Sequence, residues 1–120
     1  MGLLSIFSSR EIDEMAQSLV QELVKRYPPS LDKPGARKLS VARITRILED
    51  LYGRAARFQQ ERRLGLYKKA RLSNTFKWAL KEQGYSDAFV DMATEGLVVY
   101  MTRKASPQTK QSGGESKKNK

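Results

Sequence analysis

The chain has 120 residues, of which 39% are hydrophobic and 30% are charged, a composition typical of one soluble globular domain. Its formal net charge of +10 favours acidic partners such as nucleic acid or anionic lipid head groups. Because it contains no cysteine and no histidine, disulfides, zinc sites with those ligands, cysteine nucleophiles and histidine-based triads are excluded. We therefore expect a non-catalytic protein with no cofactor and no metal.

The first predicted element is a helix from about Ser9 to Arg26. Ser8 and Glu11 match the capping-box pattern, and Phe7 precedes them as a hydrophobic staple. One broad face of this helix is apolar, with residues at steps of three and four: Ile12, Met15, Ala16, Leu19, Val20, Leu23 and Val24. That face must pack against the rest of the domain.

The segment before this helix, Met1 to Phe7, is mainly apolar. It is too short for a signal peptide and has no basic start, so we expect a cytoplasmic protein. Four of its residues, beside the excess of lysine, also leave a role at a membrane surface open: Leu3, Leu4, Ile6 and Phe7.

Pro28 and Pro29 end the first helix, and a connection of about ten residues leads to a second helix over Ser40 to Arg63. Ser40 is placed to cap it, and Gly53 within it suggests a close helix crossing. An apolar stripe faces the core: Val41, Ile44, Leu48, Leu51, Tyr52, Ala55 and Phe58. Arginines occupy a different side or the end of the helix and are candidate phosphate contacts: Arg43, Arg46, Arg54, Arg57, Arg62 and Arg63. The alternative is a solvated face paired with Asp50 and Glu61.

Residues Leu64 to Gln83 continue the basic region. If they are helical, the core side is predicted to hold Leu66, Ala70, Phe76 and Leu80. A second row mixes aromatic, basic and amide side chains, with two lysines beside it: Tyr67, Arg71, Asn74, Trp78 and Lys81, with Lys68 and Lys69. Such a row suits nucleic acid, since rings stack on bases while cations neutralise phosphate. The alternative is that Tyr67 and Trp78 pack against a neighbouring helix with their polar tips reaching water. The sequence leaves open whether residues 54–83 form one helix, a bent helix, or pieces broken near Gly65 and Ser73.

The last predicted helix runs from Asp87 to Arg103, after a stop at Gly84 and a cap at Ser86. It is apolar around more than half of its circumference, so we expect it to be the most buried helix or a dimer interface. Ala93 and Gly96 would allow a close approach by another helix.

The sequence as a whole predicts an all-α fold, a compact bundle of four main helices in residues 1–104. Whether the third helix is bent or split stays open. Residues 105–120 are polar and lysine-rich, and we expect a disordered tail there.

The function that these patterns favour is nucleic-acid binding by a basic helical surface with interleaved aromatic residues, with DNA and RNA not distinguished. About six phosphate contacts would give a salt slope near −5 for duplex. The alternatives are a protein-interaction or homodimerisation module acting through the last helix, and a peripheral membrane-surface binder.

Overall fold

The computed structural model describes the backbone of residues 2–36 and 39–105 and the side chains of residues 9–36 and 39–103. Within these ranges the protein is all-α, as the sequence predicts, and contains no strand. Its elements are α1 (Gly2–Arg26), the short 3-10 helix η1 (Pro29–Asp32), α2 (Val41–Arg62), α3 (Leu66–Gln83) and α4 (Asp87–Ala105). The predicted tail, from residue 106 onward, lies outside the described residues, as do Arg37 and Lys38.

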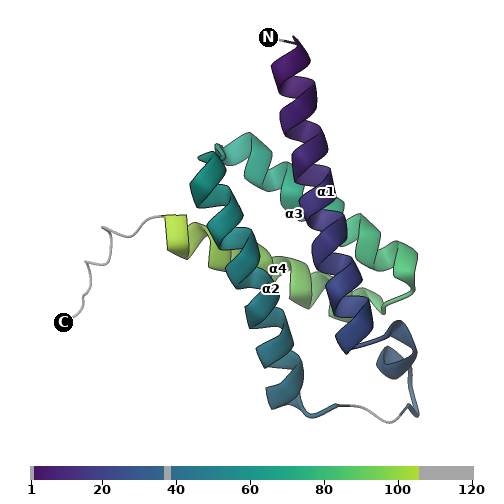
Figure 1. The fold of residues 1–120 in the computed structure, drawn as a ribbon. Coiled ribbons are helices and arrows are strands. Elements are labelled where there is room, and N and C mark those ends of the chain that lie inside the picture. The colour runs from purple at the N-terminus through teal and green to yellow at the C-terminus, as the bar shows by residue number, and fades with distance from the viewer. Residues whose placement is uncertain (1, 37–38, 106–120) are drawn as a thin grey trace, which may run out of the picture.

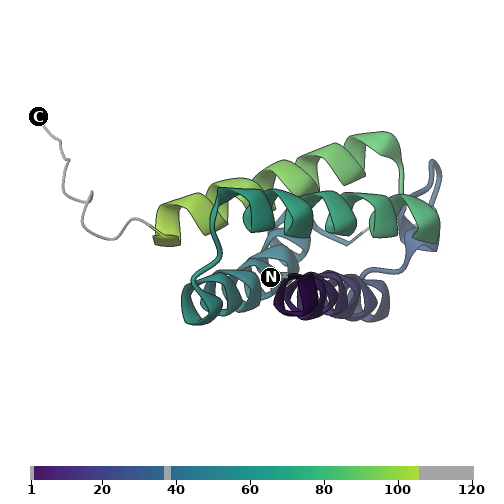
Figure 2. The same ribbon diagram turned by 90° about the horizontal axis from the view of Figure 1, so that it is seen from above.

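The four helices form two layers, seen face-on in Figure 1 and edge-on in Figure 2. α1 and α2 make one layer, and α3 and α4 cross it as the other. α1 packs mainly on α3, while α2 packs mainly on α4. The Cα atoms extend over 47 × 44 × 19 Å, so the molecule is a slab two helices thick.

The hydrophobic core lies between the two layers and draws on all four helices. Burying a Leu or Phe side chain fully stabilises the fold by about 1.5 to 3 kcal/mol, so this contact is the main force holding the layers together. Its central members are Ile12, Ala16, Leu19, Val20, Leu23, Leu48, Leu51, Ala55, Leu72, Phe76, Leu80, Val90, Ala93 and Leu97.

Three of the predicted helix-end signals are confirmed. The hydroxyl of Ser40 accepts a hydrogen bond from the backbone N–H of Arg43 at 3.1 Å. Ser86 caps α4 in the same way by accepting from the N–H of Phe89 at 3.2 Å. Gly84 ends α3 with a φ of 100°, a left-handed conformation that glycine adopts without strain.

A break at residues 63–65 separates α2 from α3 and settles the question that the sequence left open. Arg63 is left-handed, with φ 53° and ψ 52°, and its backbone N–H and that of Leu64 donate to carbonyl oxygens in the last turn of α2. Gly65 then occupies the N-cap position of α3. From there α3 passes through Ser73 without interruption.

Hydrogen bonds and packed aromatic rings join the end of α1 and η1 to the turn between α3 and α4. The Tyr85 hydroxyl donates to the carbonyl oxygen of Tyr27 at 2.5 Å, and the backbone N–H of Ser86 donates to the Asp32 carboxylate at 2.6 Å. The Tyr27 hydroxyl donates to the same carboxylate at 3.2 Å. The rings of Tyr27, Tyr85 and Phe89 lie 5.0 to 6.0 Å apart, centroid to centroid. Burial, followed by the charge of Asp32, raises the pKa of Tyr27 to about 12.

The start of the first helix differs from the prediction. α1 begins at Gly2 rather than at Ser9, so a cap at Ser8 is wrong. Leu3 and Leu4 favour helical backbone, and a serine inside a helix costs less than about 1 kcal/mol, so the capping pattern does not stop the helix. The predicted packing of Phe7 lies outside the described side chains.

Parts of two predicted core stripes are exposed instead of buried. Val41 is exposed at the start of α2, and Leu66 and Ala70 are exposed on α3. The buried residues of α3 are Leu72, Ser73, Phe76, Ala79 and Leu80. α3 starts afresh after the break, so the burial of this cluster decides which way the helix is rotated. Leu66 and Ala70 then lie on the side of α3 that faces α4.

α4 is not the most buried helix, which corrects the prediction. Five of its described residues are buried, namely Phe89, Val90, Ala93, Leu97 and Met101, whereas α2 has eight. Met92, Val98 and Val99 are exposed. α4 contacts both α2 and α3, and its exposed side chains lie away from those contacts.

The predicted close approach at Ala93 and Gly96 is confirmed. The Tyr52 hydroxyl donates to the carbonyl oxygen of Ala93 at 2.7 Å. A Cβ atom on Gly96 would lie 2.9 Å from carbon atoms of the same tyrosine ring. At Gly53, where a close crossing was also expected, a Cβ atom would meet nothing within 4 Å, so that expectation is wrong.

Candidate nucleic-acid interface

The outer face of α3 carries two exposed aromatic rings. Leu72, Phe76 and Leu80 turn toward the other layer, so side chains on the opposite side of the helix point to solvent. Tyr67 is 77% exposed and Trp78 is 54% exposed, so neither ring is buried in the core. They are eleven residues apart, about 16 Å along one side of the helix.

Polar and basic side chains lie beside these rings. Asn74 is exposed between them, and the exposed Lys81 places its ammonium 5.2 Å from the centroid of the Trp78 ring and 3.9 Å from the carboxylate of Asp87, which is itself largely exposed. Such a cation–π contact contributes about 0.5 to 1 kcal/mol at an exposed site. Lys68 and Lys69 are half-buried, and no described residue forms an ion pair with either.

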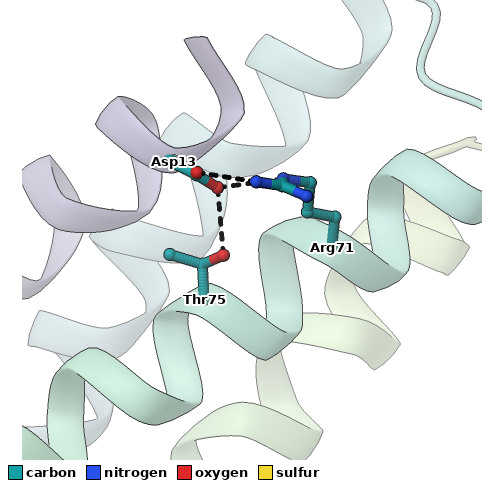
Figure 3. A network of polar contacts seen from close by, with 3 residues as sticks. All are labelled: Asp13, Arg71 and Thr75. Carbon is teal, nitrogen blue, oxygen red and sulfur yellow. Dashed lines mark hydrogen bonds and ion pairs between the residues drawn. The ribbon is translucent and has the colours of Figure 1, made fainter. Parts of the chain in front are cut away.

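Arg71, in the same row, is bound to Asp13 of α1 (Figure 3). Its Nε and Nη2 atoms donate to the two carboxylate oxygens at 3.1 and 2.9 Å, and the Thr75 hydroxyl donates to the same carboxylate at 3.1 Å. The hydrogen bond from Arg71 is the main reason that the pKa of Asp13 lies below its ordinary value. Arg71 therefore fixes the crossing of α1 over α3, and its charge is already balanced.

The predicted arginines of α2 lie in the other layer. Arg54 donates to the Ser18 hydroxyl at 2.9 Å, and Arg62 pairs with Glu11 at 3.4 Å. Arg57 is exposed beside them. The contacts of Arg54 and Arg62 tie α2 to α1 within their layer.

The predicted basic surface is thus divided between the layers. Arg43 and Arg46 are exposed near the start of α2, and Arg63 is exposed in the turn between the layers. The predicted basic residues lie in both layers, because the break at residues 63–65 sends the chain from one layer into the other. The residues that share the exposed side of α3 are Tyr67, Asn74, Trp78 and Lys81, with the half-buried Lys68 at its edge, and we call these five residues the α3 outer face.

An apolar groove between α3 and α4 was missed by the sequence analysis. It encloses about 390 Å³, and its apolar lining includes Leu66, Ala70, Val98 and Met101. The Thr94 hydroxyl in its lining is buried without a hydrogen-bond partner. The sequence signal for the groove was Gly65, since a helix that restarts there need not keep Leu66 in the core.

No family model, no curated protein and no solved structure matches this chain. In the part of the chain that the structure describes, none of the helices has the length and apolar character needed to cross a membrane.

Proposed function

We propose that the protein binds single-stranded nucleic acid through the α3 outer face. The observation that carries this proposal is the joint exposure of Tyr67 and Trp78 on one side of one helix, among basic side chains. An exposed ring in water gains free energy by stacking on a base, and a row of rings and cations matches a strand that alternates bases and phosphates. The net charge of +10 favours the same partner.

Each member of the face has a distinct role in this proposal. Tyr67 and Trp78 stack on bases, Lys68 and Lys81 neutralise phosphates, and the Asn74 amide hydrogen-bonds to a base edge. Binding is weak, salt-dependent and largely independent of sequence. No chemical step is involved, and the role is compatible with the cytoplasmic location that the sequence suggested.

Fluorescence of the protein tests this directly, because Trp78 is the only tryptophan in the chain. A single-stranded oligonucleotide should quench it saturably. Tyr67→Ala should weaken binding by about 1 to 3 kcal/mol, and Trp78→Ala should do the same when a labelled oligonucleotide is followed by anisotropy. Affinity for duplex should change much less, because its bases are already stacked.

Met92→Ala provides the matched control, since Met92 is an exposed apolar residue on α4 outside this face. It should leave affinity unchanged, and circular dichroism should show the same helix content in all variants. An unmodified protein that fails to retard any nucleic acid at about 50 mM salt and micromolar concentration contradicts the proposal.

A protein-interaction role is the second candidate, and the groove between α3 and α4 favours it. Leu66 is 85% exposed beside the groove, and Val98 and Val99 are exposed on the neighbouring helix. Light scattering over a range of concentrations tests self-association through this face. A mass above that of the monomer, abolished by Leu66→Lys, would support this second role, and a constant monomer mass would rule out homodimerisation.

A further inference from the structure

A second basic site lies in the α1/α2 layer, away from the α3 outer face. A recess of about 550 Å³ opens where the end of α1 meets the start of α2. Three of its lining residues are arginines, Arg26, Arg43 and Arg46, and none is an acid. The remaining lining residues are Leu39, Ser40, Ala42 and Ile47.

The balance of charge around this recess is positive. Arg26 pairs with Asp50 on the next turns of α2 at 3.0 Å, and that contact holds the guanidinium at the rim. Arg43 and Arg46 are exposed, and no described residue forms an ion pair with either of them. With Arg26 paired to Asp50, the two guanidinium groups of Arg43 and Arg46 line the same recess without an ion-pair partner among the described residues, and an anion bound there would relieve the repulsion between their charges.

The chemistry of the arginines selects the kind of anion. A guanidinium presents several N–H donors in a planar fork that fits phosphate oxygens two at a time. A phosphate monoester carries about −1.5 to −2 charges at neutral pH and has three acceptor oxygens, enough for more than one such fork. A phosphodiester offers fewer free oxygens and less charge at one point.

We propose that the arginine recess formed by Arg26, Arg43 and Arg46 binds a phosphate monoester group. The site is independent of the proposed nucleic-acid binding, because the two surfaces lie in different layers and share no residue. Its anion could be the terminal phosphate of a nucleic acid, a phosphate head group of a lipid, or a free small phosphate.

Inorganic phosphate is the first probe, added to the full chain at constant ionic strength with chloride. Amide resonances of Ala42 and Arg43 and the Nε–H resonances of the recess arginines should shift saturably. Arg43→Gln with Arg46→Gln should weaken phosphate affinity about tenfold or more, as expected for losing charge-assisted hydrogen bonds. Arg57→Gln with Arg63→Gln removes the same charge elsewhere and should leave affinity unchanged.

Two results would overturn the proposal. One is the absence of a saturable shift at these resonances. The other is an equal loss in the control pair, which would mean that phosphate responds only to overall charge. Neither result bears on quenching of Trp78 by oligonucleotides, so failure here and failure of the nucleic-acid proposal are distinguishable.

Two further arms identify the source of the phosphate. A 5′-phosphorylated oligonucleotide that binds more tightly than its 5′-hydroxyl counterpart, with the gain lost in the recess variant, assigns a nucleic-acid end. Binding to vesicles with phosphatidic acid but not to neutral vesicles, lost in the same variant, assigns a lipid head group. If inorganic phosphate binds saturably but neither the 5′-phosphate nor the phosphatidic acid increases binding, the ligand is a free small phosphate.

Discussion

The carboxylate of Asp13 is the point at which α1 is tied to α3. It accepts hydrogen bonds from two nitrogen atoms of Arg71 and from Thr75, so it lies between two helices that are far apart in sequence. Both side chains of the ion pair are 38% exposed, so solvent screens the interaction and limits its contribution to about 1 kcal/mol or less. Its value lies in orientation, since a bidentate pair permits few relative rotations of the helices.

Asp13 should give the protein part of its sensitivity to acid. Its pKa is lowered in the folded state, chiefly by Arg71, so its stabilising contribution is present above the unfolded pKa of about 3.9. That contribution is lost as pH falls through the folded value. Asp13→Asn should therefore lower the free energy of unfolding at pH 7 and change it much less at pH 2.5, measured with urea.

Glu14→Gln is the control for that measurement, because Glu14 is exposed and has no ion-pair partner among the described residues. Its pH dependence should follow the unmodified protein. An equal difference between Asp13→Asn and the unmodified protein at both pH values would contradict the assigned role.

Buried tyrosines should make the fold sensitive to alkali. Burial raises the pKa of Tyr27, Tyr52 and Tyr85 above the unfolded value of about 10. A raised folded pKa means that the stabilising contribution is complete below that pH and declines as pH rises above it. The free energy of unfolding should fall between pH 8 and pH 11, and less so in Tyr52→Phe and Tyr85→Phe. If the free energy of unfolding falls as much in both variants as in the unmodified protein, ionisation of Tyr52 and Tyr85 is not the cause.

At the scale of helices, replacing a glycine by alanine should have opposite effects on stability at Gly53 of α2 and Gly96 of α4. Gly96→Ala should destabilise the protein by about 1 to 3 kcal/mol, because the new methyl group would displace the Tyr52 ring. Gly53→Ala should stabilise it by about 0.5 to 1 kcal/mol, because that position is open and alanine favours helix. Urea unfolding of both variants checks this, and a stabilised Gly96→Ala would mean that the ring moves at no cost.

Local signals predicted the helices better than their faces. Ser40, Gly84 and Ser86 act through their own backbone neighbours, so their effects can be predicted from adjacent residues. The inward rotation of α3 depends instead on which apolar cluster the opposite layer accepts. Leu66 fits a core stripe equally well in the sequence, and only tertiary packing turns it outward.

The sequence predicted the grouping of the candidate site's residues only where they lie on a single helix. Tyr67 and Trp78 share a face because helical periodicity alone puts them there, and that periodicity survives any arrangement of the other helices. Arg54 and Arg71 were assigned to the same surface, but each has a partner on α1 that no local pattern reveals. Contacts between distant segments are the information that single-sequence reasoning lacks.

At the scale of the whole molecule, the division of charge between layers changes the expected response to salt. If the two lysines of the α3 outer face, Lys68 and Lys81, carry the phosphate contacts of single-strand binding, the logarithm of affinity should fall against the logarithm of salt with a slope of about −1.4. This is shallower than the slope of about −4 that six contacts on one continuous surface would give for a single strand.

Two variants with equal loss of charge separate these cases, using a 5′-hydroxyl strand. Lys68→Gln with Lys81→Gln should flatten the slope by about 1.4, the change for two lost phosphate contacts. Arg43→Gln with Arg46→Gln should leave the slope as it is, because those arginines lie in the other layer. If the slope flattens equally in both variants, basic residues of both layers contact the strand.

The pairing of α1 with α3 and of α2 with α4 has a consequence for how the chain can be divided. α1, α2 and α3 each make most of their contacts with a helix from the other half of the sequence, so within the described residues neither the α1/α2 half nor the α3/α4 half holds more than a part of the core. Cleaving the chain at Gly65, in the turn between the layers, would yield two fragments that are each unfolded alone. Mixed together, they should recover helical structure by fragment complementation, with a midpoint that depends on their concentration.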